Sequence, residues 1–434
     1  MNHSEESCIA LVNGTLIDGN RDGPVPNSTV ILRGKKIEEV GKKEKIIIPD
    51  AAIKWDVTGK FILPGFMDAH VHLAAYAGDQ RIEPRLWRLE NPAALKILHA
   101  YKNAKETLMA GFTTVRNAGN VTTREPEDII LRDTIQEGTV SGPKILACGG
   151  GVSMTAGKGA LYYPAYLPVV PDLGLGERTA DGPYEVRKEV RHRLRIGADF
   201  IKIYTSGGVA SKGDKPEYDN WTLEEIKAAT EEAHNFGKRV ASHAEGLNGI
   251  KNAIMGGVDT IEHACILDDE AIEMMLKAGT YVSTTLVVMK AIADGQVRFP
   301  VSNYVIEKAK ALAEIHFDSI RRAHEAGVKI VLGTDTFDLL RHGENAVEFH
   351  HLVEAGLSPM EAIKAATKTA AEAFDLSDDV GSIEKGKLAD LLVIDGNPLE
   401  NIRLLEEKDR IELVFKAGKM VKNQKQAKDS NTDS

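Results

Sequence analysis

The sequence of 434 residues contains only three cysteines, Cys8, Cys148 and Cys265, which lie far apart and form no Cys-x-x-Cys pair. This usage argues against a disulfide framework and against a structural zinc knuckle. No stretch approaches the roughly 18 consecutive apolar residues of a membrane span. The N-terminus lacks the basic and then apolar segments of a secretory signal. We therefore expect a cytoplasmic protein that does not contact a membrane.

Concentrated positive charge is also missing. The formal net charge is -10, and the basic residues are scattered without a long run. Because nucleic-acid binders need a concentrated basic patch, we expect no nucleic-acid partner. The chain is 43% hydrophobic and 27% charged, as in ordinary globular proteins with a large core. Only the polar residues 425–434 are expected to form a disordered tail.

From residue 61 onward, apolar segments alternate with long helical patterns, which is typical of parallel βα units. Eight strands close a (β/α)₈ TIM barrel of about 250 residues. The fold class predicted is therefore α/β with such a barrel. The eight strand candidates are residues 61–72, 113–119, 144–149, 200–206, 239–244, 260–264, 281–286 and 329–334.

The two ends of the chain show a different sequence pattern. Residues 8–57 read as short strands with tight turns, and similar strands return at 386–395 and 411–421. We infer one small β-sandwich domain built from both chain ends. The predicted division is a composite β-sandwich (1–60 and 380–424), a barrel (61–379) and a tail (425–434).

The first barrel strand carries two histidines, His70 and His72, after a Pro-Gly bend. Side chains of residues two apart on a strand point to the same face. Both imidazoles can therefore bind one cation. A solvated strand or loop that happens to hold two histidines is an equally good explanation of the pair on its own.

Polar residues also occur at the ends of later strands, where barrel enzymes place their active sites. Lys202 lies between two isoleucines of the fourth strand, and His243, His263 and Asp335 end the fifth, sixth and eighth. Alone, each has a structural explanation: a lysine stem reaching solvent, a hydrogen-bonded core histidine, or a helix N-cap. Their coincidence with the His-x-His pair favours one common site.

A buried Lys202 is disfavoured as an ammonium, because burial removes its hydration. A neutral lysine can react with carbon dioxide to give a carbamate, an anionic oxygen ligand able to bridge two divalent ions. Four neutral imidazoles, this carbamate and an aspartate suit zinc or a similar borderline metal. Nitrogen-rich coordination argues against calcium and magnesium.

Five motifs together resemble the metal-dependent amidohydrolase superfamily: Pro-Gly-Phe-Met-Asp-Ala-His-Val-His, Ile-Lys-Ile-Tyr-Thr-Ser-Gly-Gly-Val, His-Ala-Glu-Gly, Glu-His and Gly-Thr-Asp-Thr. Lys202 with Ser-Gly-Gly-Val is similar to the binuclear branch that contains Xaa-Pro dipeptidases (prolidases) and carboxypeptidase-like enzymes. The resemblance covers about residues 8–422. It implies a first metal on His70, His72 and Asp335, a second on His243 and His263, and a carboxylated Lys202 bridging them.

By this resemblance, the chain is expected to cleave an amide C–N bond of a small molecule, most simply a dipeptide or an N-acyl amino acid. Asp335 would accept the proton of the attacking water and pass it to the leaving amine. Tyr218 and His342 are predicted to lie near the substrate. Lys158 stands where many relatives have a histidine, and is predicted to contact the substrate or to face solvent. On the second strand, Arg116-Asn117 replaces a commoner Arg-Asp.

Three alternatives stay open. The first is a hydrolase of a cyclic amide, similar to imidazolonepropionase, but such enzymes generally use one metal and no strand-four lysine. The second is hydrolysis of a xenobiotic amide or carbamate at the same site, since the loops that select substrates vary. The third is an inactive scaffold. We also expect a homo-oligomer, with the segment 161–183 shaping the pocket or an oligomer contact.

Overall fold

The computed structural model describes residues 7–424 except 77, 79, 80, 120–125, 160–177 and 212. The predicted tail and most of the segment 161–183 lie outside these residues, so both expectations stay predictions. Within the described part, every helix is too short or too polar to cross a membrane.

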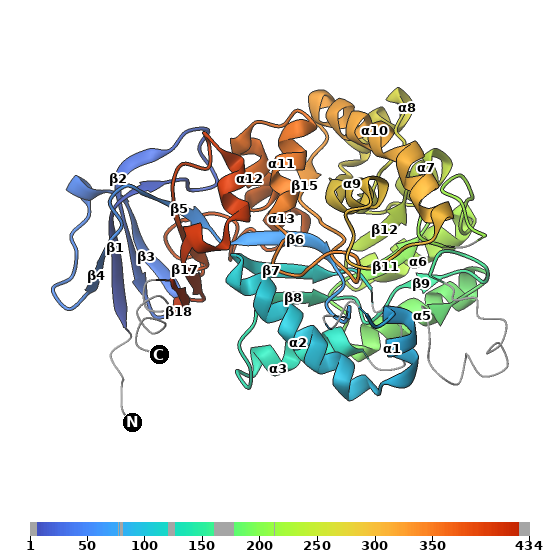
Figure 1. The fold of residues 1–434 in the computed structure, drawn as a ribbon, viewed down its shortest axis with the longest axis horizontal. Helices are drawn as coiled ribbons and strands as arrows, with labels where there is room; N and C mark the ends of the chain where they lie inside the picture. The colour runs from blue at the N-terminus through green and yellow to red at the C-terminus, as the bar shows by residue number, and fades with distance from the viewer. Residues whose placement is uncertain are drawn as a thin grey trace.

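The fold is α/β with parallel-strand sheets (Figure 1). Each predicted strand segment overlaps an observed strand that is parallel to its hydrogen-bonded neighbours. All of these strands except the half-buried β8 are buried throughout, as expected for parallel strands covered on both faces. They are β6 (Phe66–Val71), β7 (Phe112–Asn117), β8 (Lys144–Ala147), β11 (Ile201–Tyr204), β12 (Val240–Ala244), β13 (Thr260–His263), β14 (Tyr281–Ser283) and β15 (Ile330–Val331).

These strands belong to two sheets, one in the order β6-β7-β8 and one in the order β10-β9-β11-β12-β13-β14-β15, with β9 (Val152–Ser153) and β10 (Arg178–Thr179) at its edge. The sheets meet where the amide of Ala69 donates to the carbonyl of Leu332 at 2.8 Å. A second contact joins the two sheets between β8 and the residues just before β11, where the amide of Asp199 donates to the carbonyl of Ala147 at 2.7 Å.

The first predicted strand was wrong in one respect, because it is two strands. β5 (Lys60–Pro64) ends at Pro64, and β6 begins at Phe66 in another sheet. Gly65 lies between them with its backbone close to Thr113, since a Cβ there would approach Thr113 Oγ1 to 2.2 Å. The close approach requires glycine, and the chain passes from one sheet to the other at this point.

Helices follow most of the parallel strands. α6 begins with a capping box, in which Thr222 and Glu225 exchange side-chain-to-backbone hydrogen bonds. The helices are α1 (Pro84–Glu90), α2 (Ala93–Met109), α3 (Glu127–Gln136), α5 (Pro183–Ile196), α6 (Leu223–Asn235), α7 (Leu247–Met255), α8 (Asp269–Ala278), α9 (Leu286–Asp294), α10 (Asn303–Ala326), α11 (Val347–Glu354), α12 (Pro359–Ala365) and α13 (Lys368–Ala373).

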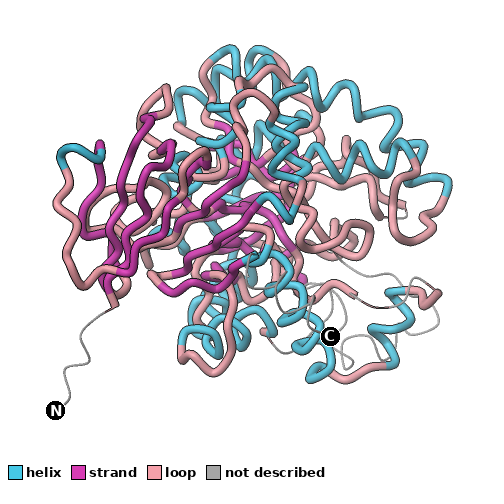
Figure 2. Tube along the Cα trace, turned by 60° about the vertical axis from the view of Figure 1, so that its left-hand side comes forward, coloured by secondary structure: helices cyan, strands magenta, loops and turns pink. Residues whose placement is uncertain are grey.

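Both chain ends contribute to one eight-stranded sheet in the order β18-β17-β16-β5-β1-β2-β3, with β4 paired to β1. β16 is antiparallel to β5, so the last strands join the first through the strand that leads into β6. Figures 1 and 2 show this sheet at one end of the molecule, away from most of the helices. Its strands are β1 (Cys8–Leu16), β2 (Val25–Arg33), β3 (Lys36–Lys42), β4 (Ile53–Asp56), β5 (Lys60–Pro64), β16 (Leu391–Asp395), β17 (Ile411–Lys416) and β18 (Lys419–Asn423).

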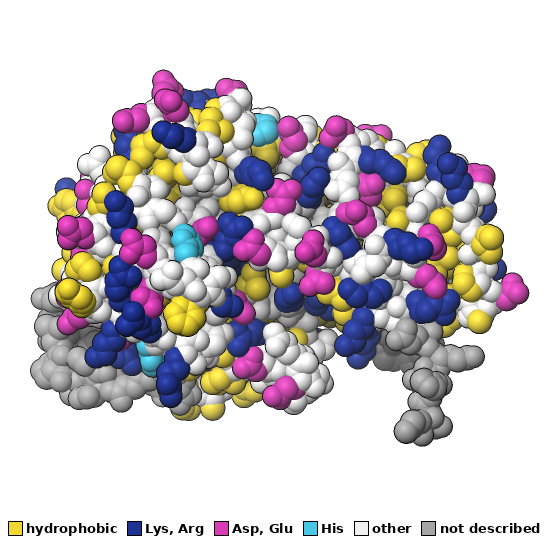
Figure 3. All heavy atoms as spheres, turned by 180° about the vertical axis from the view of Figure 1, so that it is seen from behind, with side chains coloured by type: hydrophobic (Ala, Val, Ile, Leu, Met, Phe, Trp, Pro, Cys, Tyr) yellow, Lys and Arg dark blue, Asp and Glu magenta, His cyan; other side chains and the backbone are white. Residues whose placement is uncertain are grey.

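The surface carries mixed charge on the face opposite to that of Figure 1. There, basic and acidic side chains of the described residues are interspersed (Figure 3). Exposed charges of the described residues are often paired, as in the contacts of Lys290 with Asp294 and of Arg321 with Asp318. Such exposed pairs contribute little to stability, typically about 0–1 kcal/mol each.

Candidate metal centre and active site

A cavity of about 560 Å³ opens at the carboxyl ends of the parallel strands. β6 carries His70, with His72 just after it, and β11 carries Lys202. β12 and β13 carry His243 and His263, while Asp335 follows β15. The lining includes all six predicted ligands and Lys158, namely His70, His72, Lys158, Lys202, His243, His263 and Asp335.

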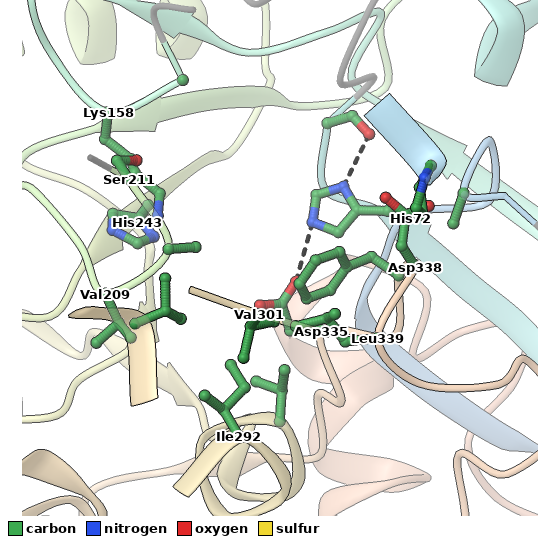
Figure 4. Close-up of a pocket in the computed structure, with 18 of the residues that line it drawn as sticks. His72, Lys158, Val209, Ser211, His243, Ile292, Val301, Asp335, Asp338 and Leu339 are labelled. Atoms are coloured by element: carbon green, nitrogen blue, oxygen red, sulfur yellow. Dashed lines mark hydrogen bonds and ion pairs between the residues drawn. The ribbon is translucent and has the colours of Figure 1, made fainter. Parts of the chain in front are cut away.

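Asp335 lies beside both histidines of the first strand. Its Oδ1 is 3.0 Å from His72 Nε2 and 3.5 Å from His70 Nε2 (Figure 4). The two rings have centroids 5.3 Å apart. The i, i+2 spacing on one strand therefore brings both Nε2 atoms to one carboxylate, as expected for a shared cation.

The other two imidazoles complete a compact group. The ring centroid of His263 is 5.0 Å from that of His70 and 4.6 Å from that of His243. Potential ligand atoms of His70, His263 and Asp335 all lie within 4.8 Å of one another. Those of His243, His263 and Glu245 also lie within 4.8 Å of one another. Either set could hold a metal ion.

Hydrogen bonds to the far nitrogen hold three of the rings. His70 Nδ1 is 2.8 Å from Glu262 Oε2, and His72 Nδ1 donates to the carbonyl of Gly119 at 3.0 Å. His263 Nδ1 is 2.7 Å from Thr285 Oγ1. Such partners fix the ring and leave Nε2 for a metal.

The fourth ring, His243, is held through its Nε2. This atom lies 3.2 Å from the carbonyl of Gly207 and 3.6 Å from Glu245 Oε1.

Glu262 connects the His70 ring to a second buried side chain. Its Oε1 accepts a hydrogen bond from the Arg116 guanidinium, which also donates to the carbonyl of Ala69 at 2.8 Å. Although burial opposes it, Arg116 holds the pKa of Glu262 far below its usual range. Glu262 is therefore a buried carboxylate that would make His70 a better metal ligand.

Two of the predicted ligands have strained backbones. His263 and Asp335 adopt left-handed φ angles of 75° and 52°. Such conformations cost about 1–3 kcal/mol each and persist only where neighbours impose them. Here His316 Nε2 donates to the carbonyl of His263 at 2.7 Å, and the amide of Asp335 donates to the carbonyl of His70 at 2.8 Å.

Lys202 fits the role of a bridging ligand. It is 2% exposed, and its Nζ has no hydrogen-bond partner among the described residues. Burial lowers its pKa to about 8. A neutral amine is thus accessible near neutral pH, and carboxylation would give this orphaned group an anionic oxygen pair that suits divalent cations.

Burial keeps three of the imidazoles neutral, whereas for His72 the effect of burial is outweighed by the hydrogen bond and charge of Asp335, which raise its pKa. Burial lowers the pKa of His70 to about 4 and those of His243 and His263 well below the usual range. Asp335 stays ionised, because His70 and His72 lower its pKa against the effect of burial. Neutral imidazoles and an ionised carboxylate are the forms that bind metals.

Lys158 and Glu245 form a charged edge beside His243. A Cβ placed on Gly208 would lie 2.7 Å from Lys158 Nζ, 2.9 Å from Glu245 Oε1 and 3.0 Å from His243 Nε2. Burial raises the pKa of Glu245 to about 7, and its Oε2 accepts from the amide of Val209 at 3.0 Å. Our sequence reasoning gave Glu245 no role, although its i+2 spacing from His243 placed it on the same face.

The structure does not bring Tyr218 or His342 into the cavity lining. Tyr218 is 50% exposed, with its ring 5.9 Å from Lys215 Nζ. His342 is buried behind the site, where its Nε2 donates to the carbonyl of His72 at 3.2 Å. His342 therefore supports the backbone of a predicted ligand.

The Arg116-Asn117 pair has a structural explanation. Asn117 Oδ1 accepts from the amide of Leu73 at 2.8 Å, and its amide group donates to the carbonyl of Gly119 at 3.2 Å. The same amide group lies 3.4 Å from Asp128 Oδ2. An aspartate in place of Asn117 would face that carboxylate with a like charge.

Sequence reasoning also missed an apolar wall of the cavity, to which α9 and the segment 299–305 contribute. The first eight residues of α9 read Leu-Val-Val-Met-Lys-Ala-Ile-Ala, and all but the lysine are buried. A helix that is apolar around most of its circumference is a signal of burial. It could have flagged α9, but not the cavity that the helix faces.

Comparisons with known proteins agree with this arrangement. A model of the amidohydrolase family matches residues 61–421. Ochratoxinase of Aspergillus niger is 31% identical over 96% of this chain and 88% of its own length. Imidazolonepropionase of Symbiobacterium thermophilum is 26% identical over 85% of this chain and 84% of its own. A solved Xaa-Pro dipeptidase with bound methionine in its active site is 34% identical, with a TM-score of 0.85, over 96% of this chain and 100% of that one.

Proposed function

The chain belongs to the amidohydrolase family, and on this premise we propose that it is a two-metal hydrolase of amide bonds in dipeptides or N-acyl amino acids. Its homologues are enzymes that act on amide C–N bonds, and the family generally uses divalent metal ions. The observation that carries the proposal is the convergence of four imidazoles and Asp335 on a cavity that also contains the orphaned amine of Lys202.

The five predicted ligands other than Lys202 would divide into two sets. His70, His72 and Asp335 would hold one ion, and His243 and His263 the other. A carbamate formed on Lys202 from carbon dioxide would bridge them. Nitrogen-rich ligands of this kind favour zinc. When bound, two such ions polarise a scissile carbonyl and make water nucleophilic near neutral pH.

The chain's own residues would orient the substrate and move the proton. Asp335 is ionised and lies at the edge of the cavity, so it would accept a proton from the attacking water and deliver it to the leaving nitrogen. Lys158 lines the same cavity beside His243, where its ammonium would stabilise negative charge developing on the carbonyl oxygen. Tyr218 and His342 lie outside the lining, so we assign them no direct contact.

A second candidate is hydrolysis of a bulky synthetic or fungal amide or carbamate at the same centre. The apolar wall and the relationship to an ochratoxinase favour it over a cyclic amide. The cyclic-amide alternative leaves the buried amine of Lys202 without a role. Retention of all six predicted ligands argues against an inactive scaffold.

We also propose that the eight parallel strands form one closed (β/α)₈ barrel, spanning residues 61–379. The contacts of Ala69 with Leu332 and of Asp199 with Ala147 support closure on both sides. The chain-end segments, 1–60 and 380–424, would form the β-sandwich. Side chains of both ends, including Leu11 and Phe415, share one buried apolar cluster in support of this.

The direct test is an assay of zinc-loaded protein against a panel of Xaa-Pro dipeptides and N-acyl amino acids. We expect hydrolysis of at least one substrate class, loss of activity after chelation, and recovery on adding zinc. A Lys158→Met variant should lose kcat more than it raises KM, because the proposed contact strengthens as charge develops. Absence of amide hydrolysis by protein with full metal content would contradict the proposal.

A further inference from the structure

One side of the cavity is an apolar chamber. Helix α9 contributes Val288, Met289 and Ile292, and the segment before α10 contributes Phe299 and Val301. Figure 4 shows Ile292 and Val301 on this side, whereas Lys158 and His243 stand together at another. The chamber and the charged edge at Lys158 are therefore distinct parts of one cavity.

The walls of the chamber are packed side chains. Val288, Met289, Ile292 and Phe299 are each 4–5% exposed and belong to one buried cluster, which also contains Leu339. Such interiors are close-packed and resist collapse. The chamber should therefore keep its shape when no substrate is bound.

Two opposite charges of the cavity lining neutralise each other. Arg88 and Asp338 both line the cavity, and Arg88 Nη1 donates to Asp338 Oδ2 at 2.6 Å. The other oxygen of Asp338 accepts from the amide of Tyr76 at 2.7 Å. Because the pair is satisfied internally, this side offers a ligand mainly apolar contact.

Asp335 and the chamber share one loop. The same short segment supplies Asp335, Phe337 and Leu339 to the lining of the cavity. In the proposed reaction, Asp335 delivers its proton to the leaving nitrogen. A group attached to that nitrogen would thus extend into the chamber.

We propose that the chamber binds a large aliphatic or aromatic side chain on the leaving amine, so that the preferred substrates are N-acyl amino acids or dipeptides with such a C-terminal residue. This inference rests on the proposed function. The cavity volume of about 560 Å³ lies within the range of roughly 300–1,000 Å³ that accommodates drug-sized ligands. A substrate with glycine or alanine as its leaving amino acid would leave the chamber filled with water and would lose the binding free energy gained from apolar burial.

A matched substrate series tests this directly. With the metal-loaded enzyme, kcat/KM should be at least about 30-fold higher for N-acetyl-L-phenylalanine than for N-acetyl-L-alanine. A second series keeps alanine as the leaving amine and enlarges the acyl group from acetyl to benzoyl. Equal kcat/KM across leaving amino acids, or a preference that follows only the acyl group, would overturn the inference.

Variants locate the effect. Ile292→Trp fills the chamber and should lower the phenylalanine-to-alanine ratio of kcat/KM at least about tenfold. Ile315→Trp is the matched control, because Ile315 is 46% exposed on α10 and outside the lining. If Ile292→Trp does not fold, Val301→Trp makes the same test. A ratio that stays unchanged in a folded chamber variant would refute the assignment.

Binding of the freed amines separates this inference from the proposed function. Calorimetry of the metal-containing protein should show L-phenylalanine binding at least about tenfold more tightly than L-alanine, with the difference reduced in the chamber variant. If no amide is hydrolysed but L-phenylalanine still binds more tightly than L-alanine, the proposed function is wrong and the assignment of the chamber is supported. Equal binding of the two amino acids would overturn the chamber even in an active enzyme.

Discussion

The strand ends that carry the imidazoles and the helix that forms the apolar wall hold their side chains in different ways. At the strand ends, directional hydrogen bonds fix each ring, as Glu262 does for His70 and Thr285 for His263. On α9, Val288 and Ile292 are held by non-directional packing within an apolar cluster. Chemistry needs nitrogen atoms at fixed positions, whereas selectivity needs only a shape. The strand ends should therefore control the reaction rate and the metal content, and the apolar wall should control the choice of substrate.

Asp335→Asn should cause the largest change in rate. Removing the ionised carboxylate should lower kcat by about 10²–10⁴-fold, because the proton has no path to the leaving nitrogen. The phenylalanine-to-alanine ratio of kcat/KM should stay within about threefold of the wild-type ratio. Steady-state kinetics on both substrates, with metal content measured in parallel, checks this. If the variant keeps most of its kcat with unchanged metal content, Asp335 is not the proton carrier.

Glu262→Gln should have the next largest effect. The amide still reaches His70 but loses the charge that pairs with Arg116, so metal affinity should fall about 10–100-fold. Competition with a chelator measures this affinity. Glu231→Gln is a suitable control, because Glu231 is an exposed partner of Arg187 far from the lining. Equal metal affinity in Glu262→Gln and the control would show that Glu262 does not support the centre.

The helix side can be perturbed through Glu348. This carboxyl group is fully buried, and it accepts hydrogen bonds from the amides of Leu286 and Val287 at the start of α9 at 2.9 and 2.7 Å. Burial raises its pKa to about 8 from 4.5. The folded state therefore holds a proton that the unfolded state releases, so this contribution to stability is present below about pH 4.5 and is lost as pH rises towards 8.

Glu348→Gln keeps the shape and cannot ionise. Its free energy of unfolding should fall less than that of the wild type between pH 5 and 8.5, while metal content stays the same. Denaturant unfolding at a series of pH values measures the difference. Parallel curves for the two proteins would mean that Glu348 is ionised throughout and that its charge is stabilised locally.

The contrast between strand ends and helix also explains which parts of the site could be predicted from the sequence. His70, His72, Lys202, His243 and Asp335 were predictable because each occurs at or near the end of an apolar strand, and parallel strands bring those ends together. The alternation that paired the first two histidines also applies to Glu245, so that residue was within reach of the same reasoning.

Residues on loops and helices were not predictable in this way. Tyr218 and His342 lie on loops after strands, and only the folded backbone shows that one is exposed and the other packs behind His72. The direction in which Ile292 points depends on how α9 packs, which no local spacing encodes. The split at Gly65 likewise follows from a close approach to Thr113, which is distant in sequence.

The two-metal centre bridged by Lys202 is the central claim, and metal stoichiometry tests it most directly. Mass spectrometry of metals in purified protein should give two ions per chain for the wild type and one or fewer for Lys202→Ala, with partial recovery when a short-chain carboxylic acid replaces the carbamate. A Lys202→Ala protein that holds two ions per chain without any added acid would contradict the bridging role.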